Sequence, residues 1–335
     1  MSMIFIRWRA WWFNKVPLSI TLMLLLADGG PLRFPALLSL ALVVLTVCAV
    51  GNYGYAINDL YDLKEDARVG RANAAAALGV RRTAVIVVLS AIAAESLAWA
   101  AAGGAGAGLT LAEIVLPFVY SAPPFRIKER KWLGIAADGL AAHVYPAVLA
   151  LMTVVHLGLR PAPWPLVACL LAWSAAAGVR GILSHQLHTA ERDRQGGLIT
   201  VVHDMGRLRL ERFIVFVLLP IEAAGFIVAV ALCNGGPALW TAGGLYLAME
   251  AFQTLNGGFT VKALRPERQP YLPFLEERFY KAWGPIVLAL DAARVDLWFL
   301  GLIPLYALLF TRHLRAEGTK LRAVWQAISR RLRRS

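Results

Sequence analysis

Long apolar segments alternate with short polar ones along most of the chain. A transmembrane helix needs about 20 predominantly apolar residues, and many segments approach that length. They lie at residues 16–29, 36–57, 83–102, 105–121, 133–156, 164–184, 212–233 and 237–256. The apolar region at 280–311 is long enough for one or two further crossings. The pattern predicts an all-α, polytopic transmembrane helical bundle of nine core helices with a tenth.

The composition agrees with a membrane protein. Of the 335 residues, 59% are hydrophobic and only 16% are charged, which is too apolar for an ordinary soluble fold. We therefore expect one transmembrane domain over residues 1–335, with the lipid bilayer as its surroundings.

Basic residues mark one side of the predicted bundle. The formal net charge is +13, but Lys and Arg cluster between apolar segments, as the positive-inside rule expects. The basic loops lie at residues 64–82, 126–131, 192–212 and 262–281. Because successive loops of a polytopic bundle alternate between the two sides of the membrane, these four basic loops all lie on the same side. We expect that side to be cytoplasmic. Membrane topology thus accounts for the charge, and we expect no nucleic acid as a partner.

Both ends of the chain carry basic residues. The tail at 312–335 is strongly basic and is expected to be cytoplasmic, which requires an even number of crossings and favours ten. Asp291, Arg294 and Asp296 would then form an outer turn between two short final helices. Residues 1–15 mix cations with indoles, which is typical of an interfacial N-terminal segment.

Residues 58–66 place a run of acids where a long apolar segment ends. On a helix, Asn58, Asp62 and Asp66 fall at i, i+4 and i+8, and Asp59 precedes Asp62 by three. Four oxygen-bearing side chains on one face would suit Mg²⁺, which keeps several waters and recruits substrate phosphates. The alternative is a solvated acidic helix end without a ligand.

A second acidic helix end follows at residues 185–193. His185, Thr189 and Asp193 form one stripe at i, i+4 and i+8, and Glu191 lies close to them. Two such ends facing each other could hold two metal ions and a diphosphate between them. The glycines at 196–197 would let the backbone turn sharply beside the phosphates.

The two sites together resemble the UbiA superfamily of membrane prenyltransferases. Residues 58–66 match its first signature, NDxxDxxxD, and residues 189–193 occupy the position of its second, DxxxD. The run Tyr-Ser-Ala-Pro-Pro-Phe-Arg-Ile-Lys at 120–128 is similar to the YSxPPxRxK loop of the family. The resemblance covers roughly residues 15–260 and implies a helical bundle around a central cavity that opens to the cytoplasmic side.

Two positions depart from the family pattern. Thr189 stands where the second signature begins with Asp, and a hydroxyl is a weaker Mg²⁺ ligand than a carboxylate. Glu191 could compensate through its longer side chain, or His185 and His188 could change what is bound. The run Arg-Ala-Asn-Ala at 71–74 also differs from the Lys/Arg, Asn, Arg series that the family often shows after its first motif.

The resemblance implies prenyl transfer, in which an allylic diphosphate ionises, pyrophosphate leaves and an acceptor captures the carbocation. It assigns Mg²⁺ to Asn58, Asp59, Asp62, Asp66, Glu191 and Asp193. The cations expected to contact diphosphate oxygens are Arg71, Arg126, Lys128 and Arg194. The predicted catalytic set is Asp59, Asp62, Asp66, Asp193, Tyr120 and His185. The alternative for each cation is that it only marks a cytoplasmic loop.

Polar groups inside apolar segments are costly and favour a functional role. They are Asn52, Glu95, Glu113, Asp138, His143, Arg180, His185 and Glu250. We expect Asp138 to pair with Arg180 or His185, either beside the cavity or as a buried ion pair that fixes helix register. His185 could orient or deprotonate the acceptor.

The predicted function is a Mg²⁺-dependent membrane prenyltransferase that moves an isoprenoid group from a diphosphate donor to an unidentified acceptor. The alternatives are a terpene cyclase on the same scaffold and a degenerate relative that binds without catalysis. A transporter is less favoured because the acids cluster at helix ends. We expect a multi-pass protein of the bacterial inner (plasma) membrane, with the active site on the cytoplasmic side and a partial lid at 259–279.

Overall fold

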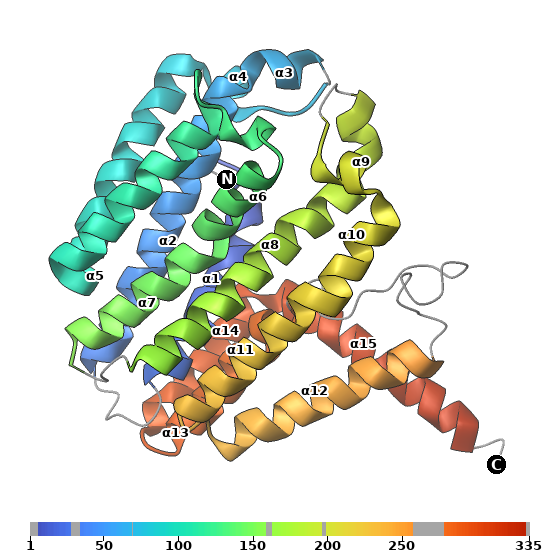
Figure 1. The fold of residues 1–335 in the computed structure, drawn as a ribbon. Coiled ribbons are helices and arrows are strands. Elements are labelled where there is room, and N and C mark those ends of the chain that lie inside the picture. The colour runs from blue at the N-terminus through green and yellow to red at the C-terminus, as the bar shows by residue number, and fades with distance from the viewer. Residues whose placement is uncertain are drawn as a thin grey trace.

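The structure is a bundle of helices, and the part of the chain that it describes contains no β-strand (Figure 1). It is a computed structural model. It describes residues 6–27, 34–68, 70–158, 163–195, 199–256 and 278–332. The predicted lid therefore lies almost wholly outside the described residues, as do the glycines at 196–197.

The helices follow the apolar segments of the sequence. In chain order they are α1 (Trp8–Ala27), α2 (Phe34–Tyr61), α3 (Leu63–Arg68), α4 (Ala74–Leu78), α5 (Val80–Ser121), η1 (Ile127–Glu129), α6 (Trp132–Gly139), η2 (Leu140–Val144), α7 (Tyr145–His156), α8 (Trp164–Gln195), α9 (Val201–Met205), α10 (Arg207–Phe213), η3 (Ile214–Leu218), α11 (Leu219–Leu232), α12 (Pro237–Asn256), η4 (Phe279–Trp283), α13 (Gly284–Ala293), η5 (Leu297–Gly301), α14 (Leu302–Leu309) and α15 (Thr311–Leu332).

The segment labelled α5 is a hairpin of two helices, as the two separate apolar stretches predicted. Ala102 and Gly103 have non-helical backbone angles, and Gly103 has a φ of +63°, which favours glycine. A Cβ on Gly106 would approach the Cβ of Ala102 to 2.6 Å, so the turn is too tight for a larger residue. Figure 1 shows the chain descending along α5 and returning beside itself. The glycine-rich run at 100–108 thus forms the turn of this hairpin.

Five described helices are long and apolar enough to cross a membrane, when α5 is taken as one. They are Leu37–Tyr61, Val80–Ser121, Trp132–His156, Trp164–Glu191 and Arg207–Leu232. Because α5 is a hairpin, its apolar length supplies two helices. Near the C-terminus, η5 and α14 contain only 5 and 8 residues. The polytopic all-helical fold is confirmed, and the count of ten crossings stays a prediction.

The expected outer turn after α13 is shorter than predicted. Asp291 lies inside α13, is buried, and accepts hydrogen bonds from the backbone N–H groups of Ala238 at 3.3 Å and Leu239 at 3.0 Å. It therefore stabilises the start of α12, where backbone donors lack partners within the helix. Asp296 accepts from the backbone N–H of Trp298 at 3.0 Å and begins η5.

Apolar contacts and one buried ion pair hold the centre of the bundle together. Trp173 of α8 packs against Phe226 of α11 and against Tyr280, with ring centroids 5.5 and 5.2 Å apart. Beside them, the guanidinium of Arg180 donates to both carboxylate oxygens of Glu222, at 2.5 and 2.9 Å. Both side chains are buried. The sequence named Asp138 as the partner of Arg180 or His185, and did not predict the pairing of Arg180 with Glu222 on the neighbouring α11.

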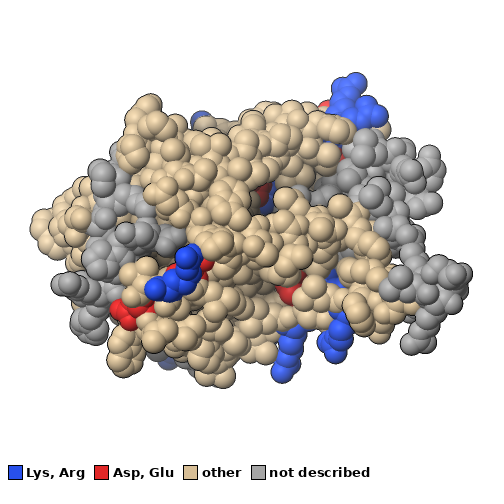
Figure 2. Space-filling model, turned by 90° about the horizontal axis from the view of Figure 1, so that it is seen from below, with Lys and Arg blue, Asp and Glu red and all other residues tan. Residues whose placement is uncertain are grey.

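Charged residues are distributed unevenly between the two ends of the bundle. The acidic motifs lie at the upper end in Figure 1, beside α3, α4 and α9. Figure 2 looks at the opposite end, where uncharged residues make up most of the described surface. The asymmetry agrees with basic loops gathered on one side of a membrane.

Removing one partner of the buried pair should destabilise the protein far more than removing an exposed pair. Glu222→Leu leaves the Arg180 guanidinium in an apolar interior, which costs about 3–5 kcal/mol. Asp204→Asn removes the exposed pair of Asp204 with Lys131 and should cost at most about 1 kcal/mol. Thermal unfolding in detergent compares the two. The double change Arg180→Met/Glu222→Leu should recover most of the loss; no recovery would contradict a pairing role.

Candidate functional site

The first acidic motif spans the end of α2 and the start of α3. Asp62 sits at a bend between the two helices, yet its backbone N–H still bonds to the carbonyl of Asn58 at 2.9 Å. The backbone N–H of Asp66 bonds in turn to the carbonyl of Asp62 at 2.8 Å. The helical spacing predicted for these residues is therefore kept through the bend.

Asp59 is buried completely, with an exposed fraction of 0%. Its Oδ1 lies 2.6 Å from a guanidinium nitrogen of Arg7, and its Oδ2 accepts a hydrogen bond of 2.9 Å from the backbone N–H of Ala74. A buried carboxylate is tolerated only when such partners replace water. Asp59 thus fixes the N-terminal segment and the start of α4 against the end of α2.

Asp66 shares partners with Asp59. The side-chain amide of Asn73 donates at 2.8 Å both to the Asp59 carbonyl and to the Asp66 carboxylate. Arg7 and Arg71 each bring a guanidinium nitrogen to 3.7 Å from Asp66. Because Asn73 also caps α4 by accepting from the backbone N–H of Ala76, one side chain holds two acidic residues and a helix start together.

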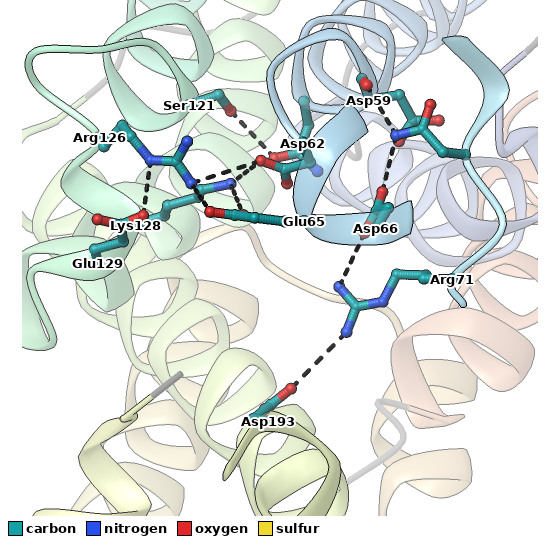
Figure 3. A network of polar contacts seen from close by, with 12 residues as sticks. Asp59, Asp62, Glu65, Asp66, Arg71, Ser121, Arg126, Lys128, Glu129 and Asp193 are labelled. Carbon is teal, nitrogen blue, oxygen red and sulfur yellow. Dashed lines mark hydrogen bonds and ion pairs between the residues drawn. The ribbon is translucent and has the colours of Figure 1, made fainter. Parts of the chain in front are cut away.

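Asp62 faces the loop after α5, where the third sequence motif lies (Figure 3). Lys128 donates to the Asp62 carboxylate, and Arg126 brings a guanidinium nitrogen to 3.9 Å from it. Arg126 also pairs with Glu65 at 2.5 Å and Glu129 at 2.7 Å. Burial lowers the pKa of Arg126, but these carboxylates outweigh it and hold the pKa above its usual value.

The backbone of Arg126 adopts an unusual conformation. Its φ of 35° lies in the left-handed region that residues other than glycine rarely adopt. Such strain persists where the surroundings impose it, often at functional sites. On the same side of the site, the hydroxyl of Ser121 donates to Asn58 at 3.1 Å. The third motif is therefore fixed to the first at two points.

Arg71 joins the first motif to the second. One guanidinium nitrogen lies 3.7 Å from Asp66, and another lies 3.9 Å from Asp193 on α8 (Figure 3). The hydroxyl of Thr189 donates to Asp193 at 2.6 Å. The structure thus brings the two acidic helix ends together across one guanidinium.

The segment after the second motif is tied to α8 and to the third motif. Thr200 begins α9, and the imidazole of His203 accepts from the Thr200 backbone N–H at 3.0 Å. The other ring nitrogen of His203 lies 3.1 Å from the carbonyl of Ala190, so His203 connects α9 with α8. Asp204 pairs with Lys131 at 2.5 Å, beside the start of α6.

Some predicted site residues lie apart from this network. Arg194 and His185 are both exposed, and neither the Arg194 side chain nor the His185 imidazole has a hydrogen bond or ion pair with the described residues. Glu191 is exposed on α8, whereas Asp193 is the acid of the second motif that faces the first. Tyr120 is partly buried near the end of α5.

The sequence interpretation missed two central residues. Arg7 was assigned to the membrane interface, but its guanidinium turns inward to Asp59, with a backbone φ of 47°. Asn73 lay in the run that was judged to depart from the family series. The position of Asn73 in the sequence could have indicated this contact. Its side-chain amide, seven residues after Asp66, can reach Asp66 only if the chain reverses direction between the two residues.

The donor set fits the chemistry of Mg²⁺, although the acids do not converge on one point. Among the described residues, no group of three or more His, Cys, Asp or Glu side chains is placed to hold one ion. Asp62 and Asp66 instead face different cations. Mg²⁺ prefers oxygen ligands, typically one or two carboxylates completed by water and phosphate, so the carboxylate and amide oxygens of this motif are donors of the kind that it binds.

The fold and the paired acidic helix ends define an integral-membrane protein with a polar site at one end of a helical bundle. Comparison with protein-family models matches the UbiA prenyltransferase family over residues 16–256. The chain belongs to this family. A search of curated proteins finds no relative.

Solved structures of UbiA homologues share the fold. Two are of a homologue from Archaeoglobus fulgidus, one bound to DMAPP and Mg²⁺ and one to GPP and Mg²⁺; each is 18% identical, has a TM-score of 0.60 and covers 88% of this chain. They are covered over 98% and 99% of their own lengths. An apo structure of a homologue from Aeropyrum pernix K1 is 14% identical, with a TM-score of 0.59 and coverage of 87% and 99%.

Asn73 should be essential for holding the first motif together. Asn73→Ala removes the donor to Asp59 and Asp66 and the cap of α4, and should cost about 1–3 kcal/mol. Asn73→Ser keeps a capping hydroxyl but cannot bridge both acids, so it should recover only the capping share, about 1 kcal/mol. Thermal unfolding and deuterium exchange of the α4 amides measure both. Full recovery in the serine variant would show that Asn73 acts as a cap alone.

Proposed function

We propose that the protein is a Mg²⁺-dependent membrane prenyltransferase that transfers an isoprenoid group from an allylic diphosphate to an acceptor and releases pyrophosphate. The observation that carries the proposal is Arg71, which lies between Asp66 of the first acidic motif and Asp193 of the second. A guanidinium held by two carboxylates can turn its remaining donors to a phosphate. The family and the diphosphates bound to the Archaeoglobus homologue support this assignment.

The site presents its cations as partners of carboxylates. Lys128 and Arg126 form ion pairs with Asp62, and Arg71 forms one with Asp66. A diphosphate entering between the two motifs would offer the same cations stronger, multiply charged acceptors. We propose that they then contact the phosphate oxygens and stabilise the negative charge that grows as the allylic carbon–oxygen bond breaks. Arg194 would join them only after a change of side-chain conformation, since it is exposed.

Mg²⁺ would be held by Asn58, Asp62 and Asp66 on one side and by Asp193 and Glu191 on the other, and when bound it supplies Lewis-acid stabilisation of the departing pyrophosphate. Asp59 differs from its neighbours. Its Oδ2 accepts a hydrogen bond from the backbone of Ala74, its Oδ1 has the Arg7 guanidinium at 2.6 Å as an ion-pair partner but accepts no hydrogen bond from the described residues, and the side chain is fully buried. We therefore propose that Asp59 acts as a positioning residue for the motif.

Thr189 replaces a charge with a hydrogen bond. Its hydroxyl donates to Asp193 and so fixes the direction of that carboxylate. The second motif then has one acid that faces the first motif, Asp193, where the family signature has two. Glu191 is the other negatively charged residue of the second motif. This arrangement accounts for how the motif keeps its geometry despite the substitution.

The reacting carbon would lie beside the third motif. We propose that Tyr120, which belongs to the third motif, presents its ring to the carbocation, since aromatic faces attract cations. His185 is proposed to act on the acceptor, for which it would have to turn from its exposed position. The protein is proposed to form one domain in the inner membrane of a bacterium, with the site facing the cytoplasm.

Asp62→Asn should abolish turnover and leave the fold intact. The change keeps the size of the side chain but removes the charge that pairs with Lys128, and we expect a loss of at least about a hundredfold. Glu65→Gln is the matched control, because Glu65 pairs with the same two cations, Lys128 and Arg126, but lies at the exposed edge of the network. It should retain most activity. Pyrophosphate release from prenyl diphosphates in detergent with Mg²⁺ measures both variants.

The same assay distinguishes the reaction classes. Turnover only when a membrane extract supplies the acceptor supports the transferase, whereas acceptor-free release with a cyclised product would replace it with a cyclase. An Asp62→Asn variant as active as the Glu65→Gln control would overturn the assignment of the site.

A further inference from the structure

The C-terminal helix α15 turns sharply away from the rest of the bundle. It lies outside the region that matches the family, which ends at residue 256. The helix Leu297–Leu309 and the helix Thr311–Ser329 meet at an angle of 87°. Figure 1 shows α15 running across the direction of α8 and α11 as it leads to the C-terminus. With an 87° bend between them, the two helices cannot both run along the bilayer normal.

One face of α15 is fixed to the bundle by polar contacts. Glu317 accepts from Arg278 at 3.4 Å and from the indole of Trp283 at 3.0 Å. Lys320 donates to Glu250 of α12, and both side chains are buried. These contacts come from two elements, so the helix is held at a defined orientation. The bundle therefore determines which face of α15 looks outward.

The outward face combines cations with large apolar side chains. Leu321 and Trp325 lie four residues apart on one stripe, with exposed fractions of 44% and 69%. Arg315 and Arg322 lie seven residues apart on an adjacent stripe, and both are exposed. Arg312, which lies over the ring of Phe13, is exposed as well. Apolar and basic stripes side by side are the pattern of a helix at a membrane surface.

The composition argues against α15 as a membrane span. Five charged residues fall in the stretch from Arg312 to Arg322, and a span would expose several of them to lipid. By contrast, the preceding α14 exposes Leu305 and Leu308, as expected of a helix against acyl chains. The chain thus passes from a lipid-facing helix to a charged one at the bend.

We propose that α15 lies in the bilayer surface and binds the phosphate groups of anionic lipids through Arg312, Arg315 and Arg322, with Leu321 and Trp325 inserted among the acyl chains. Charge complementarity favours this occupant, because guanidinium groups pair with lipid phosphates and the same face of a second copy would bring arginines against arginines. The surface goes beyond the proposed enzymatic function, since it lies on a different element from the acidic motifs.

Deuterium exchange of the α15 amides in nanodiscs tests the proposal on the full-length protein. Discs of phosphatidylcholine alone are compared with discs that hold equal amounts of phosphatidylcholine and anionic phosphatidylglycerol. Anionic lipid should slow the exchange of α15, and each arginine should account for about a fivefold effect at low salt. Arg315→Gln/Arg322→Gln should remove most of the slowing, and high salt should weaken it in the unaltered protein.

A matched control removes the same charge elsewhere. Arg81→Gln/Arg82→Gln changes two exposed arginines at the start of α5 and should leave the lipid dependence of α15 unchanged. Equal exchange in both lipids for the unaltered protein would overturn the proposal, as would full lipid dependence in the Arg315/Arg322 variant. Protection that depends on two copies per disc instead of lipid charge would assign the surface to an interface between copies. Retained pyrophosphate release would show that the variants are folded.

Discussion

Carboxylates buried at the end of a membrane helix must be neutralised, and this requirement organises the upper end of the molecule. Asp59 is fully buried, and Arg7 and the backbone of Ala74 replace the water it has lost. Asn73 ties Asp66 to the same point. To provide these partners, the N-terminal segment, the turn after α3 and the start of α4 all converge on α2. The buried carboxylates need polar partners in place of water, and those partners together form the polar site.

Much of the fold could be predicted because each apolar stretch carries its own signal. The two stretches at 83–102 and 105–121 predicted two helices, and the tight turn at Gly103 separates them. Contacts between helices that are distant in the sequence could not be predicted in this way. Arg180 could be recognised as a buried cation, but its partner Glu222 lies 42 residues away on α11. Helical periodicity says which face of a helix is apolar and leaves open which neighbour covers it.

The same distinction holds at the site. Spacing predicted that Asn58, Asp62 and Asp66 keep one helical register, and the two bonds along the backbone agree. Spacing could not show that Arg7 crosses from the N-terminus to Asp59, because that contact depends on how α1 packs against α2. It also could not tell that Asp193, and not Glu191, meets Arg71. Side-chain direction at a helix end is decided by the opposing loop.

The central claim is that the two acidic motifs form one diphosphate site. A double-mutant cycle tests it through the binding of a non-hydrolysable prenyl thiodiphosphate with Mg²⁺, measured by calorimetry for Asp66→Asn, Asp193→Asn and the double variant. Residues that share one ligand should show a coupling free energy of about 1 kcal/mol or more. Effects that add to within about 0.3–0.5 kcal/mol would show two independent sites and contradict the account.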